Sequence, residues 1–153
     1  MQFRMEVRGL DELHARFRNF PQKWTKALGK TMQASLLILW GSVPKYPKPP
    51  VDSTYRRTGM LGRSMGVAIE GGRVGQPDIY EIRKLGGYQE ARFGTRLRYA
   101  QYVIGERQAQ IHQGRWWTLP KTVVDKAIPK INRAFEKLAV ALAKYLDKGT
   151  NPS

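Results

Sequence analysis

Apolar side chains recur every three or four residues in two long stretches of the chain, which is the spacing of an amphipathic α-helix. The first stretch begins after Asp11, a suitable N-cap, is interrupted at Pro21 and resumes until the residue before Pro44. The second follows Pro120 and alternates spacings of four and three, which suits packing along another helix. Pro129 either kinks this second helix or marks its true start. The expected apolar positions are Trp24, Leu28, Met32, Leu36, Leu39 and Val43 in the first helix, and Val124, Ile128, Ile131, Phe135, Leu138, Leu142 and Tyr145 in the second.

Shorter segments have the apolar alternation and turn residues typical of β-strands. Residues 3–7, 65–70, 79–85 and 91–95 each fit a strand, and an antiparallel sheet is the simplest arrangement of the last three. For residues 99–104 the pattern leaves a strand or a short helical turn open. The prediction is an α+β fold in which a long N-terminal helix and a C-terminal helix pack on a small antiparallel sheet. The two helices are the most economical partners for each other, although a helix seam between subunits has the same pattern.

A proline-rich segment separates the first helix from the sheet. Four of the seven residues 44–50 are proline, which removes backbone donors and holds the segment extended. Residues 44–59 are therefore expected to form an extended loop, either an arm that reaches another subunit or a plain crossover. The chain as a whole is predicted to be a single domain over residues 1–148, followed by a frayed tail at 149–153.

Composition narrows the classes of protein. With 153 residues and 41% apolar side chains, the chain has material for one compact core. The absence of cysteine excludes disulfides, thiolate zinc sites and thiol nucleophiles, and it fits a reducing compartment. No apolar run approaches the roughly 20 residues of a membrane span. The first residues alternate apolar and polar side chains, so the usual secretion signal is not expected.

The net charge of +15 is concentrated in particular segments. Residues 44–63 and 92–115 each carry five basic and one acidic residue, whereas residues 64–91 carry three basic and four acidic. A solvated face explains the helical charges, but basic loops with so little acidic compensation repel one another unless a polyanion or an acidic protein face lies near. The candidate residues for contact with such a partner are Arg56, Arg57, Arg63, Arg96 and Arg98.

The sequence offers little for catalysis. Neither His14 nor His112 has a carboxylate or a second histidine at metal-ligand spacing, and Ser53, Thr58 and Ser64 lack an identifiable base. The glycine pairs at 71–72 and 86–87 do not precede a helix with lysine and a hydroxyl, so they indicate turns. We expect no enzyme activity, no cofactor and no metal.

Three motifs occur in order along the chain. They are Arg-Thr-Gly-Met-Leu-Gly-Arg-Ser at residues 57–64, Tyr-Ala-Gln-Tyr-Val at residues 99–103 and Arg-Trp-Trp-Thr at residues 115–118. Together with the opening Gly-Leu-Asp-Glu-Leu at residues 9–13, this order resembles the small tail-completion or neck proteins of long-tailed phages, often labelled tail components. The resemblance covers nearly the whole chain, with Gln101 standing where many relatives carry proline.

The resemblance implies a structural virion protein that forms a ring, commonly sixfold, at the joint between the capsid portal and the tail tube. Such a ring completes the tail and joins it to the head, with double-stranded DNA passing through its channel. Its implied partners are head-closure or connector proteins, the tail terminator and the tail tube, and its implied location is the neck of the virion, or the host cytoplasm during assembly.

Aromatic residues in the loops are the candidates for contacts between subunits. For the adjacent tryptophans we expect one ring in the core and the other at an interface, with burial of both as the alternative. A free nucleic-acid-binding protein without sequence preference, not part of a virion, is the competing function, and its oligomeric state separates it from a ring protein. The interface candidates are Tyr46, Tyr55, Tyr99, Tyr102, Trp116 and Trp117.

Overall fold

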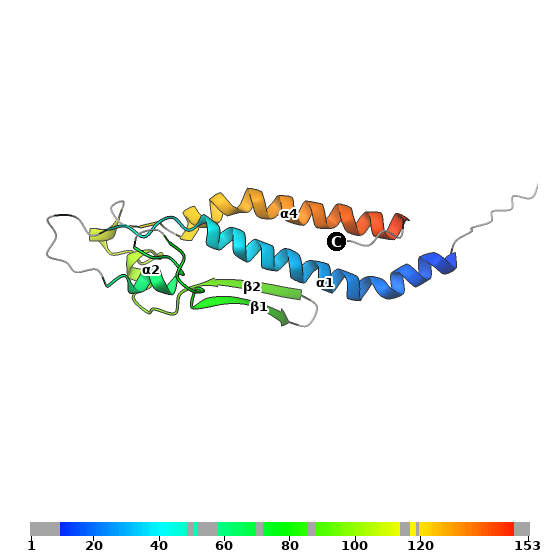
Figure 1. Cartoon of the computed structure of the whole chain (residues 1–153), viewed down its shortest axis with the longest axis horizontal. Coiled ribbons are helices and arrows are strands. Elements are labelled where there is room, and N and C mark those ends of the chain that lie inside the picture. Colours follow the sequence, from blue (N-terminus) through cyan, green and yellow to red (C-terminus); the bar gives the residue numbers. More distant parts are fainter. Residues whose placement is uncertain are drawn as a thin grey trace, which may run out of the picture.

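The fold is α+β, as predicted, with three layers in which one long helix lies between a second helix and a β-hairpin (Figure 1). The computed structural model describes residues 10–48, 51, 58–69, 72–85, 88–113, 117, 118 and 120–148. The predicted strand at residues 3–7 and the predicted tail at 149–153 lie outside the described residues. The helices are α1 (Leu10–Ser42), α2 (Met60–Ser64), α3 (Ala100–Val103) and α4 (Pro120–Lys148), with a 3-10 turn η1 (Gln110–His112), and the strands are β1 (Ile79–Leu85) and β2 (Tyr88–Gly94).

The expected interruption at Pro21 is wrong, because α1 runs through it as one helix of 33 residues. Proline lacks the N–H that bonds to the fourth preceding carbonyl, and a long helix that continues through a proline accommodates this loss by bending. Here the Thr25 hydroxyl donates to the Pro21 carbonyl oxygen (2.8 Å), and the rings of Phe20 and Trp24 stack across the same turn, 6.2 Å apart. The axis of α1 bends in its N-terminal part (Figure 1).

The predicted packing of the two long helices on each other is confirmed, and they run antiparallel (Figure 1). Leu138 and Leu142 of α4 are buried against Ala27 of α1, with Leu28 and Phe135 packed around them. Pro120 is the first residue of α4, a position where its missing N–H is not needed. Among the described residues, no helix is both long enough and apolar enough to cross a membrane.

The buried face of α4 differs from the predicted one before Pro129, which lies inside the helix and is not its start. Val124 and Ile128 are exposed, and Val123 and Ala127 are buried in their place. A repeat of 3.5 residues drifts by about 20° per heptad around a helix of 3.6 residues per turn. Extended backwards from Tyr145 over three heptads, the predicted stripe therefore leaves the contact with α1.

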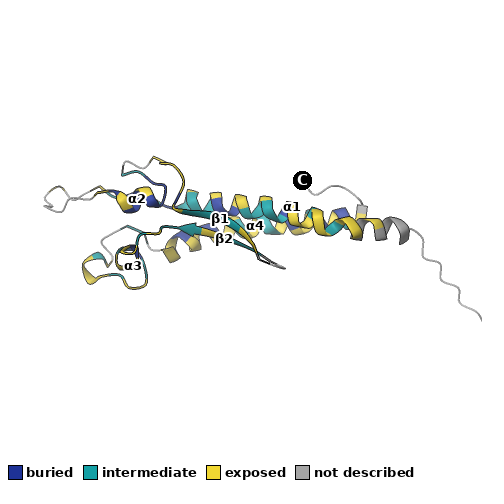
Figure 2. Ribbon diagram, turned by 90° about the horizontal axis from the view of Figure 1, so that it is seen from below, coloured by how far each residue is buried: buried dark blue, intermediate teal, exposed yellow. Residues whose placement is uncertain are grey.

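The sheet has two strands within the described residues, not three. β1 and β2 pair antiparallel with Ile82 opposite Ala91, and both strands pack on α1 (Figure 2). The predicted strand at residues 65–70 is wrong for its described part, where Val67 forms a single bridge with Arg73. The cause is Gly66, whose backbone is left-handed (φ +70°) and lies so close beneath Trp40 that a Cβ would stand 2.8 Å from the indole nitrogen.

The remaining described segments gather at one end of the molecule, around α2, α3 and η1, and we call this region the loop end (Figure 1). Its core joins residues from the end of α1 to the start of α4. The Trp117 ring packs edge-on against Tyr46 (5.0 Å between centroids), and its indole N–H donates to the Pro44 carbonyl oxygen (3.3 Å). The buried members of this core are Val43, Tyr46, Leu61, Met65, Val67, Ala100, Ile104 and Val123.

Candidate basic interface at the loop end

The first basic segment is held by a tight turn into α2. Gly59 takes a left-handed backbone (φ +67°), and a Cβ there would stand 2.9 Å from Ile69 Cδ1. The Arg63 guanidinium donates to the Thr58 carbonyl oxygen (2.7 Å), which ties the short helix back to the turn that precedes it. The side chain of Arg63 remains exposed. This turn therefore depends on Gly59, because only glycine adopts that backbone conformation without strain, and it leaves the Arg63 side chain exposed to solvent.

Hydrogen bonds join this turn to the second basic segment. The Thr95 hydroxyl donates to Ser64 Oγ (2.7 Å), while Asp78 receives the backbone N–H of Arg96 on its carboxylate (3.2 Å) and donates its own N–H to the Ser64 carbonyl oxygen (2.8 Å). We call these contacts the Ser64–Thr95–Asp78 junction. They place Arg63 and Arg96, 33 positions apart in the sequence, each directly beside a residue of the same junction.

The positive charge at this junction is only partly offset by described neighbours. Arg63, Arg96 and Arg98 are exposed, and within the part of the chain that the structure describes none of them forms an ion pair. The Asp78 carboxylate accepts the backbone N–H of Arg96, and its negative charge offsets part of the positive charge of the three arginines. The other two candidate arginines, Arg56 and Arg57, lie outside the described residues.

The six aromatic candidates divide into two described groups. Tyr99 and Tyr102 are exposed, at 42% and 47%, beside and on α3. Tyr46 is 4% exposed in the loop-end core, which corrects its prediction as an interface residue. Trp117 is half-buried against the Tyr46 ring, and its predicted interface role stays a prediction. This also shows that the start of the 44–59 loop folds back on the chain. Tyr55 and Trp116 lie outside the described residues.

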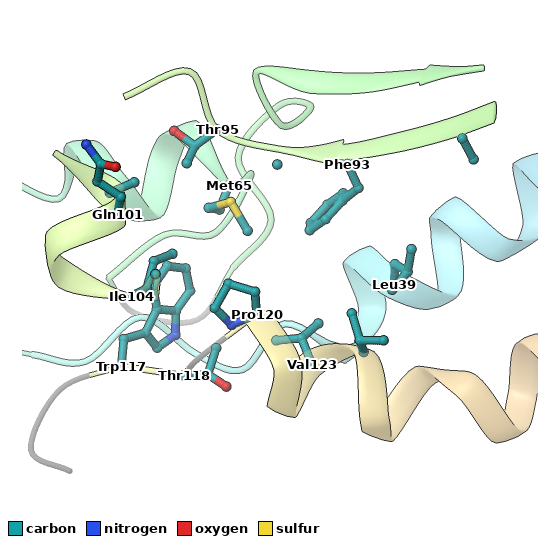
Figure 3. Close-up of a pocket in the computed structure, with 15 residues that line it drawn as sticks. Leu39, Met65, Phe93, Thr95, Gln101, Ile104, Trp117, Thr118, Pro120 and Val123 are labelled. Carbon is teal, nitrogen blue, oxygen red and sulfur yellow. The ribbon is translucent and has the colours of Figure 1, made fainter. Parts of the chain in front are cut away.

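A cavity of about 410 Å³ opens behind the junction, and the sequence did not predict it (Figure 3). Met65, Phe93, Pro120 and Val123 surround it, and the side chain of Trp117 borders it from below in this view. Its walls come from α1, β2, α3 and the start of α4, so no single segment of sequence carries its pattern. The walls are mostly apolar, with Thr95, Gln101 and Thr118 as the polar exceptions.

The described residues offer few groups for chemistry. No group of three or more His, Asp or Glu side chains that could hold a metal ion occurs among them. His112 is half-buried in η1, away from any such group. The pKa of Tyr80 is raised above its ordinary value because burial beside α1 disfavours the phenolate, but this residue lies on the sheet. What the loop end presents is exposed cationic and aromatic surface.

No family model matches this chain, and neither a curated protein nor a solved structure matches it. The motifs of the sequence can nevertheless be given physical roles. Gly59 makes the turn, Leu61 fills the core, Ser64 belongs to the junction and Ala100 packs against the same core. The motif residues in the described part are thus mainly supports, and the exposed residues between them are the candidates for contact with other molecules.

Proposed function

We propose that this protein is a structural component of the neck of long-tailed phages, in which several copies form a ring that completes the tail and joins it to the head. Besides the resemblance of the motifs, the observation that carries the proposal is the convergence of exposed arginines and tyrosines at the loop end. Thr95 and Ser64 link the segments that carry Arg63 and Arg96 through a bond of 2.7 Å. The loop end therefore combines exposed positive charge with exposed aromatic side chains.

This combination suits contact with another macromolecule. Tyrosine and arginine are enriched at protein interfaces, where the ring supplies apolar area and the guanidinium pairs with carboxylates or phosphates. Tyr99 and Tyr102 would face a neighbouring subunit or ring, and Arg63, Arg96 and Arg98 would face an acidic ring or the DNA in the channel. In this role the protein acts by binding and holding, not by catalysis.

The proposal is tested by removing the exposed aromatic area. Tyr99→Ala with Tyr102→Ala should leave a folded chain, since both rings are exposed, but should prevent assembly on tail tubes of the same phage. Val140→Ala is the matched control, because Val140 is 55% exposed on α4. Circular dichroism checks the fold, and mass photometry with and without tail tubes measures assembly. Normal assembly of the double variant would contradict the proposal.

A nucleic-acid-binding protein that is not part of a virion remains the second candidate, favoured by the exposed arginines, which form no ion pair with a described residue. Arg63→Gln, Arg96→Gln and Arg98→Gln together separate the two functions. For the neck protein, the triple variant should fail to dock on tail tubes or to pass DNA. For the alternative, the wild-type chain should bind duplex DNA as a monomer and show no affinity for tail tubes at all.

A further inference from the structure

A row of cations follows one side of α4, far from the arginines of the loop end in the sequence. Lys126, Lys130, Arg133 and Lys137 are spaced by four, three and four residues, and all four side chains are exposed. Residues at this spacing lie almost in a straight line along a helix. At 1.5 Å per residue the row is about 17 Å long. We call it the α4 basic stripe.

The stripe lies away from the contact between the long helices. Each residue turns about 100° around the helix, which puts the stripe on a flank of α4 different from the one that carries the buried Ala127, Leu138 and Leu142. In Figure 1 α4 forms an outer layer of the body, with α1 beside it. The stripe is therefore open to a partner along its whole length.

The described chain offsets only part of this charge. Neighbours along the stripe are cations three or four positions apart, an arrangement that destabilises an isolated helix. None of the four side chains forms an ion pair with a described residue. Asp125 precedes Lys126 by one position and so lies about 100° around the helix from it. Glu136 follows Arg133 by three positions and so lies beside that end of the stripe, where it offsets one of the four charges.

We propose that the α4 basic stripe is a docking surface for the sugar-phosphate backbone of duplex DNA, bound without sequence preference. Duplex DNA carries one charge per about 1.7 Å of its axis, so a length of duplex equal to the stripe carries roughly ten phosphates on its two strands together, which exceeds the four cations of the stripe. Three of the four residues are lysine, which is depleted at protein interfaces but common in phosphate contacts. The stripe also contains no aromatic ring of the kind that anchors protein partners.

A second copy of the chain is a poor occupant for this surface. On the sheet, Glu81 is already paired with Arg83 (2.7 Å) and Arg92 (3.6 Å), so it offers no free acidic row. The inference goes beyond the proposed neck function, because it concerns the isolated chain and needs no ring. If tail assembly fails while this DNA contact is found, the neck function is refuted and the stripe remains.

The test compares two variants of equal net charge. The stripe variant carries Lys126→Gln, Lys130→Gln, Arg133→Gln and Lys137→Gln. The control variant removes four exposed cations from other surfaces, namely Arg18→Gln, Lys84→Gln, Arg107→Gln and Lys121→Gln. Fluorescence anisotropy measures binding of each full-length chain to two unrelated 20-base-pair duplexes between 50 and 200 mM salt. Thermal melting checks the fold, and the stripe variant should melt no lower than wild type because it loses like-charge repulsion.

Each phosphate contact contributes about 0.9 to the slope of log affinity against log salt. We expect the stripe variant to lower the magnitude of that slope by about 3 to 4 and the control variant by less than about 1. Equal losses in both variants would overturn the proposal, since net charge alone would then explain binding. So would a strong preference for one duplex. A stripe variant that binds DNA like wild type but loses affinity for a poly-glutamate peptide would assign the stripe to an acidic protein instead.

Discussion

The pair of long helices, α1 and α4, and the loop end both bury apolar side chains, but the two regions are held together in different ways. In the helix pair the contacts come from apolar residues that recur at regular spacing along each helix, as with Leu138 and Leu142. At the loop end, short segments are joined by single hydrogen bonds between residues far apart in the sequence, such as Trp117 to Pro44 and Thr95 to Ser64. The helix pair is thus specified by the periodic spacing of apolar residues, and the loop end by contacts between individual pairs of residues.

Truncating one buried leucine in each region should give the largest effects. Leu61 at the loop end and Leu142 in the helix pair are 2% and 4% exposed, so Leu61→Ala and Leu142→Ala should each lower the free energy of unfolding by about 2–5 kcal/mol. Leu37→Ala, at a residue 53% exposed on α1, is the control and should change it by less than about 0.5 kcal/mol. Denaturant unfolding measures all three.

Amide hydrogen exchange on the same variants sharpens the comparison. Leu142→Ala should reduce protection along both long helices, because they share one seam. Leu61→Ala should reduce it mainly in α2 and α3, whose backbone bonds depend on the local core. If Leu61→Ala instead lowers protection throughout α1 and α4, the two regions form one cooperative unit and the contrast between them is lost.

A single added methyl group at Gly62 should come next in size. A Cβ there would stand 2.7 Å from both Tyr46 Cγ and the Val67 carbonyl oxygen, and the carbonyl belongs to the backbone and cannot move aside cheaply. Gly62→Ala should therefore cost about 1–3 kcal/mol in unfolding experiments. Gly41→Ala in α1 meets nothing within 4 Å and should leave stability unchanged or raise it by up to about 1 kcal/mol. Two equal losses would mean that the close packing around Gly62 is not what decides the cost.

These contrasts explain how much of the molecule could be predicted. The long helices, their mutual packing and the strand at 79–85 follow from apolar spacing, which reports local geometry directly. The break at Pro21 was predicted wrongly because α1 accommodates the lost backbone bond and continues, with a bend in its N-terminal part. The strand at residues 65–70 was wrong because its apolar residues pack into the core around a turn at Gly66.

The sequence predicts only part of the candidate site, because residues from separate segments come together there. Counting basic and acidic residues along the sequence identifies the two segments that carry Arg63 and Arg96, because the charge of a segment follows directly from its residues. It could not find the Ser64–Thr95–Asp78 junction that brings them together, because the pairing depends on how three separate loops meet. Their position in loops makes the aromatic residues interface candidates, but Tyr46 and Trp117 pack against each other within the chain. Exposure, which separates them from Tyr99 and Tyr102, is a property of the fold.

The junction itself should contribute less than either core. Ser64 is 7% exposed, so Ser64→Ala leaves the Thr95 hydroxyl without its nearest partner and should cost about 1 kcal/mol. In a double-mutant cycle with Thr95→Val, we expect a coupling of about 0.5–1.5 kcal/mol. Ser64→Ala combined with Thr25→Val, whose hydroxyl bond lies within α1, should be additive. Additivity in the first pair as well would remove the junction as the link between the basic segments.

The smallest effect concerns Tyr80, where the sheet meets α1 and its ring packs edge-on against Trp40 (5.8 Å between centroids). Burial raises the pKa of Tyr80 above its ordinary value, so the folded state holds the phenol proton more tightly than the unfolded state. The protonated Tyr80 phenol therefore contributes to the stability of the fold. This stabilisation is fully present below pH 10, the ordinary tyrosine pKa, and is lost as the pH rises from there through the folded-state pKa. Tyr80→Phe keeps the contact with Trp40 and removes the titration. Unfolding free energies measured at pH 8 and pH 11 should therefore fall less steeply in Tyr80→Phe than in wild type, and parallel falls would show that the phenol is as accessible to water in the fold as in the unfolded chain.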